Sequence, residues 1–535
     1  MSTQDPRRWW ALIALVPAVL VVGIDATVLG LALPTLATSL RASTAELQWF
    51  VAAYALVFAA AMVPAGMLGD RYGRKKLLII ALVVLGAGSV ACGYATSAGL
   101  FIAARALLGL GAAIIVPMAL GAIPVLFSEE ERPKAVATIM AATMIGQPIG
   151  PLLGGWLLTS YWWGSVFLIN VPVVVVALVA VALLVPESQS TERTRFDLIG
   201  IAASSAGLAT LMYGVIEAGQ NGWGSPGAVG AMLAGAAVLA GFALWERRVR
   251  DPLVDLRLFR SPGFTWGIVL ATLVSFAMFG VLFATPLYFQ DVLGLSAFGN
   301  GLRQLPLIGG LLIGAIVGTR MTTRTGAKAT VALGFVLLAA GLFLGATTGL
   351  GNGGGFAMAW LAIAGAGIGF VMPAAMNAAL GALSPEHAGV GSGLIQALRM
   401  VGGSFGAAIL GSVLNSTYQG RLSLGGLPAQ VAAIVRDSVA AGVAVAHQLG
   451  SAALLESVRS AFVHGMDVAL LVCGGVAVVG VALTLAFLPD RERDRAAAAA
   501  RSDVAAAAPS VAAAAAAPRP SDEGVESGHG PVFGK

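Results

Sequence analysis

Charge is scarce in this sequence of 535 residues. Only 11% of the residues are Asp, Glu, Lys or Arg, whereas soluble domains average about 25%. At the same time, 58% of the residues are apolar. So few charges cannot cover a soluble globular surface. We therefore predict an all-α polytopic membrane protein, in which runs of about 20 apolar residues cross the bilayer.

Residues for redox or metal chemistry are scarce as well. The sequence has four histidines without metal-ligand spacing and two cysteines, Cys92 and Cys473, which lie in apolar runs. We predict that the cysteines pack in the interior and that no metal is bound. Because neither a G-x(4)-G-K-[ST] loop nor a nucleophile–base pair is recognisable, we predict no enzyme, no ATP hydrolysis and no cofactor. The net charge of +5 without a basic tract argues against a nucleic-acid partner.

Fourteen apolar segments are long enough to span a bilayer. The first contains Asp25 and is too long for the apolar core of a cleaved signal peptide, so we predict a retained helix. The predicted spans are residues 9–33, 46–68, 77–96, 100–125, 135–159, 164–186, 197–218, 226–246, 263–288, 301–319, 328–349, 355–381, 391–413 and 466–488.

The basic residues orient these spans. If the N-terminus is cytoplasmic, 24 of the 31 Lys and Arg lie in inside segments, five lie in outside loops, and Arg105 and Arg399 lie within spans. Such asymmetry predicts that both termini are cytoplasmic. Arg is far commoner than Lys and Ala is abundant, which is typical of a GC-rich bacterial genome. We therefore expect the cytoplasmic membrane of a bacterium.

The loop between the second and third spans carries the strongest motif. Residues 66–76 read GMLGDRYGRKK, which resembles the signature loop of the major facilitator superfamily, G-x-L-x-D-R-x-G-R-[RK]. Glycine permits close helix approach and tight reversals, and a carboxylate suits a helix N-terminus. We predict a conformational gating loop in which two glycines let helices approach, a third makes the reversal, and the basic residues pair with acids on the facing bundle. Its residues are Gly66, Gly69, Asp70, Arg71, Gly73 and Arg74.

Two further sequence motifs also resemble motifs of this superfamily. The fourth span reads FIAARALLGLG over residues 101–111 and is similar to the Arg-bearing motif of that helix in the superfamily. The fifth reads GQPIGPLLGG over 146–155, like the G-x(3)-G-P-x(2)-G-G signature of proton-driven antiporters. Its glycines permit near contact of helix backbones and its prolines permit a bend. The predicted antiporter-motif residues are Gly146, Pro148, Gly150, Pro151, Gly154 and Gly155.

The first span points to one branch of the superfamily. Residues 23–34 (GIDATVLGLALP) resemble the L-D-x-T-[IV]-x-x-x-A-L-P motif of the fourteen-span drug:proton antiporters, the quaternary-ammonium and multidrug efflux type. Segments 167–172, 286–290 and 389–403 resemble this branch too. There are departures: the usual W-R-W before 167 reads WGS, the second copy of the signature loop is degenerate, and the tenth span lacks a carboxylate, which argues against dication transport.

The resemblance implies a major facilitator fold with 14 transmembrane helices: two six-helix bundles plus two linker helices. A central cavity would open alternately to each side. The tail is too poor in apolar bulk to fold, so we predict disorder there. The expected parts are a cytoplasmic N-terminus 1–8, an N-terminal bundle 9–186, two additional spans with a linker 187–261, a C-terminal bundle 262–488 with a long outside loop 414–465, and a cytoplasmic tail 489–535.

Ionisable residues inside spans are costly and usually functional. Asp25 and Arg105 lie at similar predicted depths below the outer boundary, at about 1.5 Å per residue. The resemblance places both helices around the cavity of the first bundle. We predict that the two side chains communicate and couple transport to protons, with Asp25 as the proton carrier. The alternative is that Asp25 only hydrogen-bonds a neighbouring helix.

The third intramembrane charge, Arg399, has no carboxylate at matching depth in its own bundle. Capping of helix carbonyls, contact with Asn377 or Gln396, and binding of an anionic substrate group all remain open. Other polar and aromatic residues are candidates for an adaptable cavity. The substrate-cavity candidates are Tyr54, Gln147, Asn170, Tyr288, Asn377, Gln396 and Arg399.

The resemblance makes proton-coupled export of lipophilic, often cationic drugs the leading function, driven by the proton gradient. The expected partners are a small lipophilic molecule, protons and the lipid bilayer, and the protein is expected to be a monomer. One alternative is a narrow self-resistance exporter of a single specialised metabolite. A proton:solute symporter is a third reading, which the antiporter string disfavours. A receptor or membrane enzyme has no supporting motif.

Overall fold

The computed structural model describes residues 7–128, 130–188, 197–249, 257–383, 388–425 and 427–489. Within these ranges the chain forms helices and no strand, which confirms the all-α prediction. The disordered tail predicted for 489–535 lies outside the described residues apart from Pro489.

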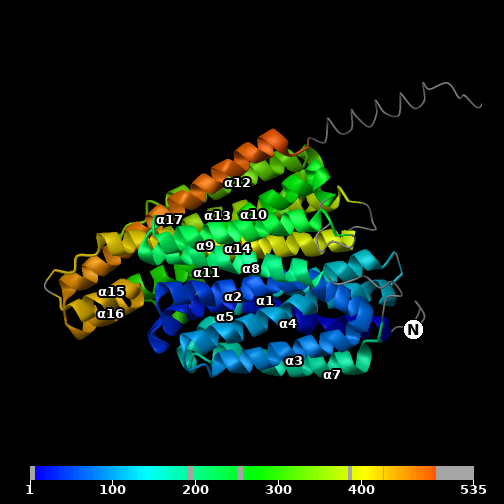
Figure 1. The fold of residues 1–535 in the computed structure, drawn as a ribbon, viewed down its shortest axis with the longest axis horizontal. Coiled ribbons are helices and arrows are strands. Elements are labelled where there is room, and N and C mark those ends of the chain that lie inside the picture. The colour runs from blue at the N-terminus through cyan, green and yellow to red at the C-terminus, as the bar shows by residue number, and fades with distance from the viewer. Residues whose placement is uncertain are drawn as a thin grey trace, which may run out of the picture. The chain divides into compact units, whose positions relative to one another are not determined.

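The first half of the chain forms one bundle, coloured blue to cyan in Figure 1. In it α1 packs on α5 and α7, and α4 packs on both α2 and α3. The predicted sixth span, 164–186, is broken at Ile169 into two helices, because Pro172 has no N–H to donate to the carbonyl of Leu168. The helices are α1 (Arg7–Ser39), α2 (Thr44–Tyr72), α3 (Arg74–Gly93), α4 (Ala98–Leu126), α5 (Arg132–Ser160), α6 (Ser165–Leu168) and α7 (Asn170–Leu184).

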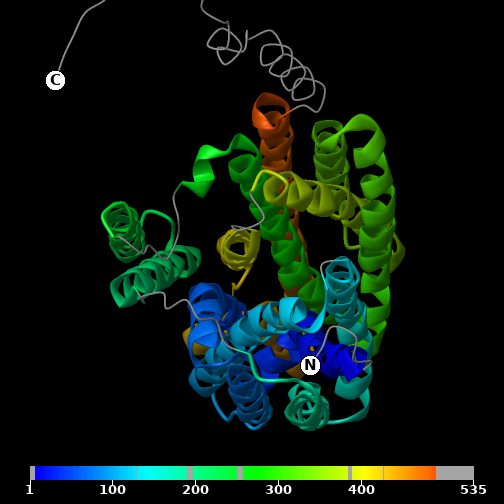
Figure 2. The same ribbon diagram turned by 90° about the vertical axis from the view of Figure 1, so that its right-hand side faces the viewer.

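Two additional helices follow, α8 (Leu198–Asn221) and α9 (Pro226–Glu246). They pack on each other, and α8 also packs on α2 and α14, so the pair lies beside the boundary between the bundles (Figure 2). Asp197 caps α8 by accepting the amide of Gly200 at 2.9 Å. The same carboxylate accepts the indole N–H of Trp245 at 3.0 Å, which joins the start of α8 to the end of α9.

The second half forms the other bundle, in which α13 packs on α11 and α12, and α10 and α17 both pack on α14. A π-helix continues α10 at its predicted outer end. The elements are η1 (Leu258–Arg260), α10 (Pro262–Leu287), η2 (Tyr288–Val292), α11 (Ala297–Thr325), α12 (Ala327–Gly345), α13 (Gly353–Leu380), α14 (Ala388–Arg421), α15 (Ala429–Asp437), α16 (Val439–Gln448) and α17 (Ala452–Phe487).

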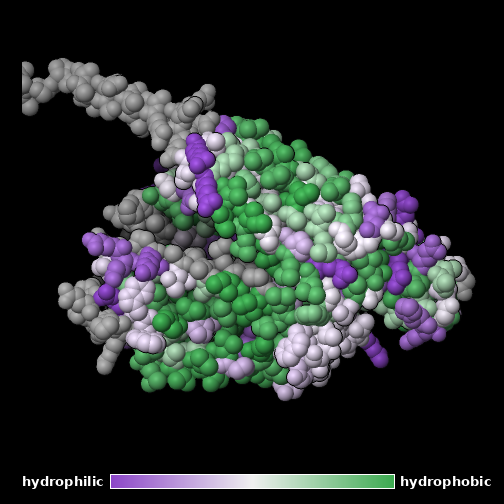
Figure 3. Space-filling view, turned by 180° about the vertical axis from the view of Figure 1, so that it is seen from behind, coloured by the Kyte–Doolittle hydropathy of each residue, from purple (hydrophilic) through white to green (hydrophobic). Residues whose placement is uncertain are grey.

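In the part of the chain that the structure describes, 13 helices are long and apolar enough to cross a membrane. The remaining predicted span corresponds to α5, a helix of 29 residues with several side chains outside the described set. The count of fourteen therefore stays a prediction at α5. The surface agrees with a membrane protein: in Figure 3 apolar side chains cover a broad band, and hydrophilic side chains gather at its two ends.

The long loop predicted for 414–465 is mostly helical. α14 continues to Arg421, and α17 begins at Ala452 rather than near 466. Between them lie α15 and α16, which we call the cap helices. The moderate hydropathy of this segment is consistent with helices outside the bilayer, which need only one apolar face.

Candidate functional site

Asp25 of α1 and Arg105 of α4 meet in the interior of the N-terminal bundle. Arg105 Nη1 donates to Asp25 Oδ2 at 3.0 Å, and the exposed fractions of the two residues are 2% and 0%. The structure thus brings together the two charges that the sequence placed at similar depth. A buried ion pair in a dry environment is held strongly only when further hydrogen bonds satisfy its remaining polar atoms.

The third helix at this site is α2. Arg105 Nε donates to the carbonyl of Phe50 at 3.1 Å, and its guanidinium lies 4.5 Å from the ring centroid of Tyr54, a cation–π contact. Gly109 of α4 lets this approach happen, since a Cβ there would collide with the backbone of Tyr54. Arg105 is therefore fixed by a carboxylate, a carbonyl and an aromatic face.

Two polar atoms at the site have no hydrogen-bond partner among the described residues: Asp25 Oδ1 and Tyr54 Oη. A buried acceptor without a partner costs free energy, commonly about 1–3 kcal/mol and more for a charged group. Oδ1 is thus free to bind a proton, since a protonated carboxyl keeps Oδ2 available for Arg105.

The antiporter motif on α5 borders the same site. Cβ atoms at Gly146 and Gly150 would lie 2.7 Å from the carbonyl of Leu20 and 2.9 Å from that of Ile24, and Gly154 contacts Val28. These three glycines, spaced four residues apart, let α5 lie against the stretch of α1 that carries Asp25. The side chain of Pro148 lies outside the described residues.

The opposite face of the α5 motif contacts the other bundle. A Cβ on Gly155 would stand 2.9 Å from the carbonyl of Ala297, and one on Gly301 would stand 2.6 Å from the carbonyl of Pro151. The motif therefore has two faces, with α1 on one side and α11 on the other. If the two bundles move relative to each other, the contact between α5 and α11 must change.

The contacts between the bundles concentrate at the helix ends predicted to face outside. Gln290 Nε2 donates to the carbonyl of Leu31 at 2.9 Å, and Gln48 Nε2 donates to the carbonyl of Ala408 at 3.1 Å. Leu282 O lies 3.2 Å from where a Cβ on Gly30 would stand. Hydrogen bonds from α2, η2 and α11 join the bundles in this region, which we call the outer seam.

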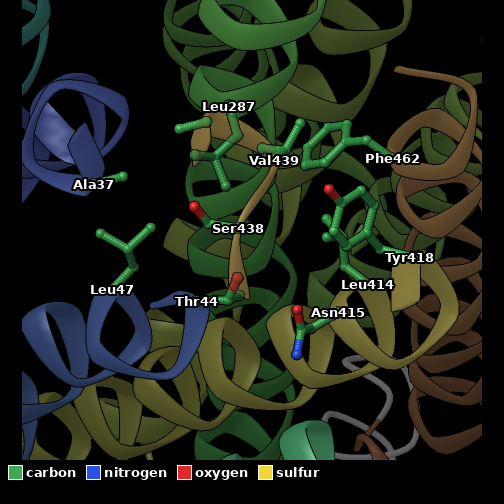
Figure 4. A pocket seen from close by; sticks show the side chains of 11 residues that line it. Ala37, Thr44, Leu47, Leu287, Leu414, Asn415, Tyr418, Ser438, Val439 and Phe462 are labelled. Carbon is green, nitrogen blue, oxygen red and sulfur yellow. The ribbon is translucent and has the colours of Figure 1, made fainter. Parts of the chain in front are cut away.

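The cap helices cover the outer seam. Tyr418 of α14 donates its hydroxyl to the carbonyl of Val435 at 2.8 Å, and Thr44 of α2 donates to the carbonyl of Asp437 at 2.8 Å, so the cap contacts both bundles. Burial raises the pKa of Asp437, and the negative charge of Glu46 raises it further. Beneath the cap is a cavity with room for about one water molecule at most, which is too small for a drug (Figure 4).

The gating loop agrees with the sequence in part. Gly73 has φ +107°, so the predicted tight reversal is confirmed. A Cβ on Gly69 would collide with Met118, which makes it a close-approach residue, whereas one on Gly66 would meet nothing within 4 Å, so the packing role predicted for Gly66 is wrong. The side chain of Asp70 lies outside the described residues.

The basic residues of the loop have contacts within their own bundle. Arg74 Nη1 donates to the carbonyl of Gly121 at 2.8 Å. Pairing of the basic residues with acids of the facing bundle stays a prediction. Arg71 is exposed and lies 5.4 Å from the ring of Tyr72.

Sequence reasoning missed Glu187, which follows α7. Its carboxylate accepts the amides of Lys75 at 3.0 Å and Lys76 at 3.2 Å, and the amide of Arg74 donates to the carbonyl of Ser188. Glu187 thus supplies the helix cap that Gly73 lacks and fixes the gating loop to α7. A Pro-Glu pair directly after a span is the only signal in the sequence, and it does not indicate a partner more than 100 residues away.

The remaining substrate-cavity candidates do not share one site in the structure. Arg399 of α14 donates from Nη1 to Gln396 Oε1 at 2.8 Å and from Nε to Ser275 Oγ of α10 at 3.3 Å. Asn377 is exposed near the end of α13, and the side chain of Gln147 lies outside the described residues. Of the contacts considered for Arg399, only the one with Gln396 is present in the described residues.

Two candidates are poorly placed for a substrate. Asn170 is buried and donates to Ser89 Oγ at 3.3 Å, which joins α7 to α3 inside the N-terminal bundle, so helix packing explains it better than a cavity. Tyr288 is fully buried in η2, and its hydroxyl has no partner among the described residues. Tyr288 begins a π-helix, a backbone irregularity that is frequent at functional sites.

Comparison with known proteins agrees with this geometry. The family described as Major Facilitator Superfamily matches residues 15–407. The chain belongs to this superfamily. Among solved structures it is similar to a bacterial homolog of the human lysosomal transporter Spinster, in an inward-facing and unoccupied conformation. The TM-score is 0.65 at 18% identity, covering 91% of this chain and 98% of that one, which shows the shared fold.

Two curated relatives cover nearly the whole chain. The tetracenomycin C resistance and export protein of Streptomyces glaucescens is 33% identical over 92% of this chain and 93% of that protein. The multidrug efflux pump LfrA of Mycolicibacterium smegmatis is 31% identical over 90% of this chain and 97% of that protein. The predicted membership in the drug-efflux branch is thereby confirmed, and the chain is a multi-pass membrane transporter.

Proposed function

We propose that this protein exports lipophilic drugs or antibiotics in exchange for protons, by alternating access. The relatives support export, and the buried Asp25–Arg105 pair is the observation that carries the coupling. Within the spans of the described residues it is the only ion pair between an acid and a base that are both almost fully buried. A group inside the membrane that exchanges a proton is what an antiporter requires.

The coupling follows from competition for one carboxylate. When Asp25 is ionised, it balances Arg105 or, transiently, the positive charge of a bound substrate. When Asp25 binds a proton on Oδ1, the pocket loses its negative charge and a cationic substrate is no longer held. Substrate and proton therefore occupy the site alternately, and the inward flow of protons drives the outward flow of drug.

The closed outer seam supports an inward-facing state in this cycle. With both termini in the cytoplasm, as the basic residues predict, the seam lies on the outside and the bundles part toward the cytoplasm. Reversal requires the α5 contact with α11 and the bond between Gln48 and Ala408 to open. The proton gradient is the sole energy source in this scheme, without a cofactor or an enzymatic step, and one monomer contains the complete path.

The test compares Asp25→Asn with wild type in an efflux-deficient bacterial host at matched membrane expression. Glu217→Gln is the control, because Glu217 lies near the predicted outer end of α8 and bonds only Asn221 among the described residues. We expect wild type and the control to lower dye retention until a protonophore is added, and Asp25→Asn to have no protonophore-sensitive efflux. Gradient-driven export by Asp25→Asn would refute the coupling role.

A narrow self-resistance exporter is the second candidate. It is favoured by the relative named for tetracenomycin C resistance and export. The same assay separates the two: resistance to many unrelated compounds supports a multidrug exporter. Resistance to one chemical class supports the narrow one, and uptake driven by protons would support a symporter.

A further inference from the structure

Arg399 is a cation that no acid neutralises. Its two hydrogen bonds go to the neutral oxygens of Gln396 and Ser275, and no carboxylate lies within ion-pair distance among the described residues. The hydroxyl of Ser275 donates to the carbonyl of Ala271 at 3.0 Å, so its oxygen lone pair is directed to Arg399. A guanidinium has five N–H groups, and these two bonds leave most of them available.

The remaining donors of Arg399 reach accessible space. Its Nη2 has no hydrogen-bond partner and yet does not belong to the buried unpartnered atoms, and the residue is half-buried. Arg399 lies nine residues before Ala408, the contact of α14 with α2, which is about 13 Å toward the predicted inner end. The guanidinium thus lies away from the outer seam, toward the predicted inner end of α14.

Two phenylalanines of α10 lie near Arg399. Phe279 lies one turn after Ser275 on the same face of α10, and its ring is adjacent to Gly403, one turn after Arg399 on α14. Phe279 and its neighbour Phe276 are half-buried. A planar aromatic group can therefore lie against Phe279 while an anionic substituent faces Arg399.

We propose that Arg399 is an anion-binding group of the substrate site, and that the protein exports aromatic weak acids carrying a carboxylate or an ionised phenol in addition to the cationic compounds that compete with protons at Asp25. This inference rests on the proposed export function and adds a second substrate class to it. The Asp25–Arg105 ion pair carries no net charge, so Arg399 leaves a positive charge uncompensated among the three intramembrane charges that the sequence indicates. An arginine fork also matches the two oxygens of a carboxylate better than a lysine ammonium does.

The charge of the substrate has a measurable consequence. Exchange of one cation for one proton moves no net charge across the membrane, whereas exchange of one anion for one proton moves two positive charges inward. Export of an aromatic acid should accordingly accelerate when the membrane is polarised negative inside. Export of a matched cation should not respond.

The experiment uses the purified full chain and two fluorescent anthraquinones of equal size, one with a carboxylate and one with a trimethylammonium group. Binding in detergent is followed by quenching of tryptophan fluorescence, and export is followed in proteoliposomes with a clamped potential. The variants are Arg399→Gln, Arg399→Lys and, as a matched loss of one positive charge, Arg320→Gln at an exposed site on α11.

We expect Arg399→Gln to weaken binding of the carboxylate probe about tenfold or more, the effect of losing one charge-assisted hydrogen bond. Arg399→Lys should recover part of that binding, while Arg320→Gln and binding of the cationic probe should be unchanged. Equal losses for both probes, or none, would overturn the proposal. Because the binding assay needs no gradient, failure of the anion site is distinguishable from failure of proton-coupled export, which the cationic probe reports.

Discussion

The two bundles surround an intramembrane arginine with different partners. In the N-terminal bundle Arg105 is held by the carboxylate of Asp25, a carbonyl and an aromatic ring, so the site is neutral as a whole. In the C-terminal bundle Arg399 is held by a serine and a glutamine, so its charge stays uncompensated. The first arrangement suits the exchange of a proton, and the second suits the binding of an anion.

This difference shows why the number of intramembrane charges alone does not define a transporter's mechanism. Both arginines interrupt apolar helices, and each is costly to bury. What separates them is whether the partner can change its own charge: a carboxylate can, and a serine or an amide cannot. The following predictions test that distinction, beginning with the largest expected effect.

Removing the cation from the ion pair should destabilise the protein far more than removing the uncompensated one. Arg105→Gln leaves Asp25 buried without its counter-ion, at a cost of about 3–5 kcal/mol, whereas Arg399→Gln replaces a charge among neutral dipoles. We expect the thermal midpoint in detergent to fall strongly for Arg105→Gln and to stay or rise for Arg399→Gln.

The double variant Asp25→Asn with Arg105→Gln is the control for that prediction. It removes both charges and should recover most of the lost stability while remaining uncoupled, because partners in one ion pair are not additive. Additive losses in the double variant would contradict the pair as the source of stability.

A second prediction concerns how each bundle fixes the turn at its predicted inner end. The N-terminal bundle caps α3 with Glu187, and the equivalent turn in the C-terminal bundle has Gly326, at φ +88°, in the cap position of α12. Glu187→Ala should cost about 1 kcal/mol, as for loss of a helix cap, and should slow export without changing probe binding. Stopped-flow efflux checks this, and reduced binding at an unchanged rate would contradict it.

The smallest effect is expected at Tyr54. Tyr54→Phe keeps the ring on Arg105 and removes a hydroxyl that has no partner among the described residues, so stability and export should hardly change. Tyr54→Leu removes the cation–π contact, worth about 0.5–2 kcal/mol, and should lower the thermal midpoint slightly. A large export defect in Tyr54→Phe would show instead that the hydroxyl takes part in proton transfer.

Much of the fold was predictable because bilayer crossing imposes long apolar runs. The contact between Asp25 and Arg105 was also within reach, since each residue's distance from its own helix end gives its depth. Hydropathy did not predict the break at Ile169, the bounds of the cap helices or the early start of α17. It carries no information on backbone hydrogen bonds and little on helices outside the bilayer.

The parts of the site that escaped prediction share a physical reason. Glu187 and Gln48 are polar residues near helix ends, where solvation is the ordinary expectation. Their partners lie at Lys75 and Ala408, more than 100 residues away in sequence. Only the packing of the bundles reveals such pairs, whereas Gly73 was predictable because its backbone reversal is a local requirement.

The length of α17 has a further consequence. Its 36 residues extend about 54 Å, whereas the apolar core of a bilayer is about 30 Å thick. The helix contains no proline, so its first turns form a rod that projects beside the cap helices. A rod of this kind acts as a lever, and a slight tilt of the C-terminal bundle becomes a larger sweep at Ala452. A spectroscopic label placed there, at the end of the helix predicted to face outside, would let the transport cycle be followed.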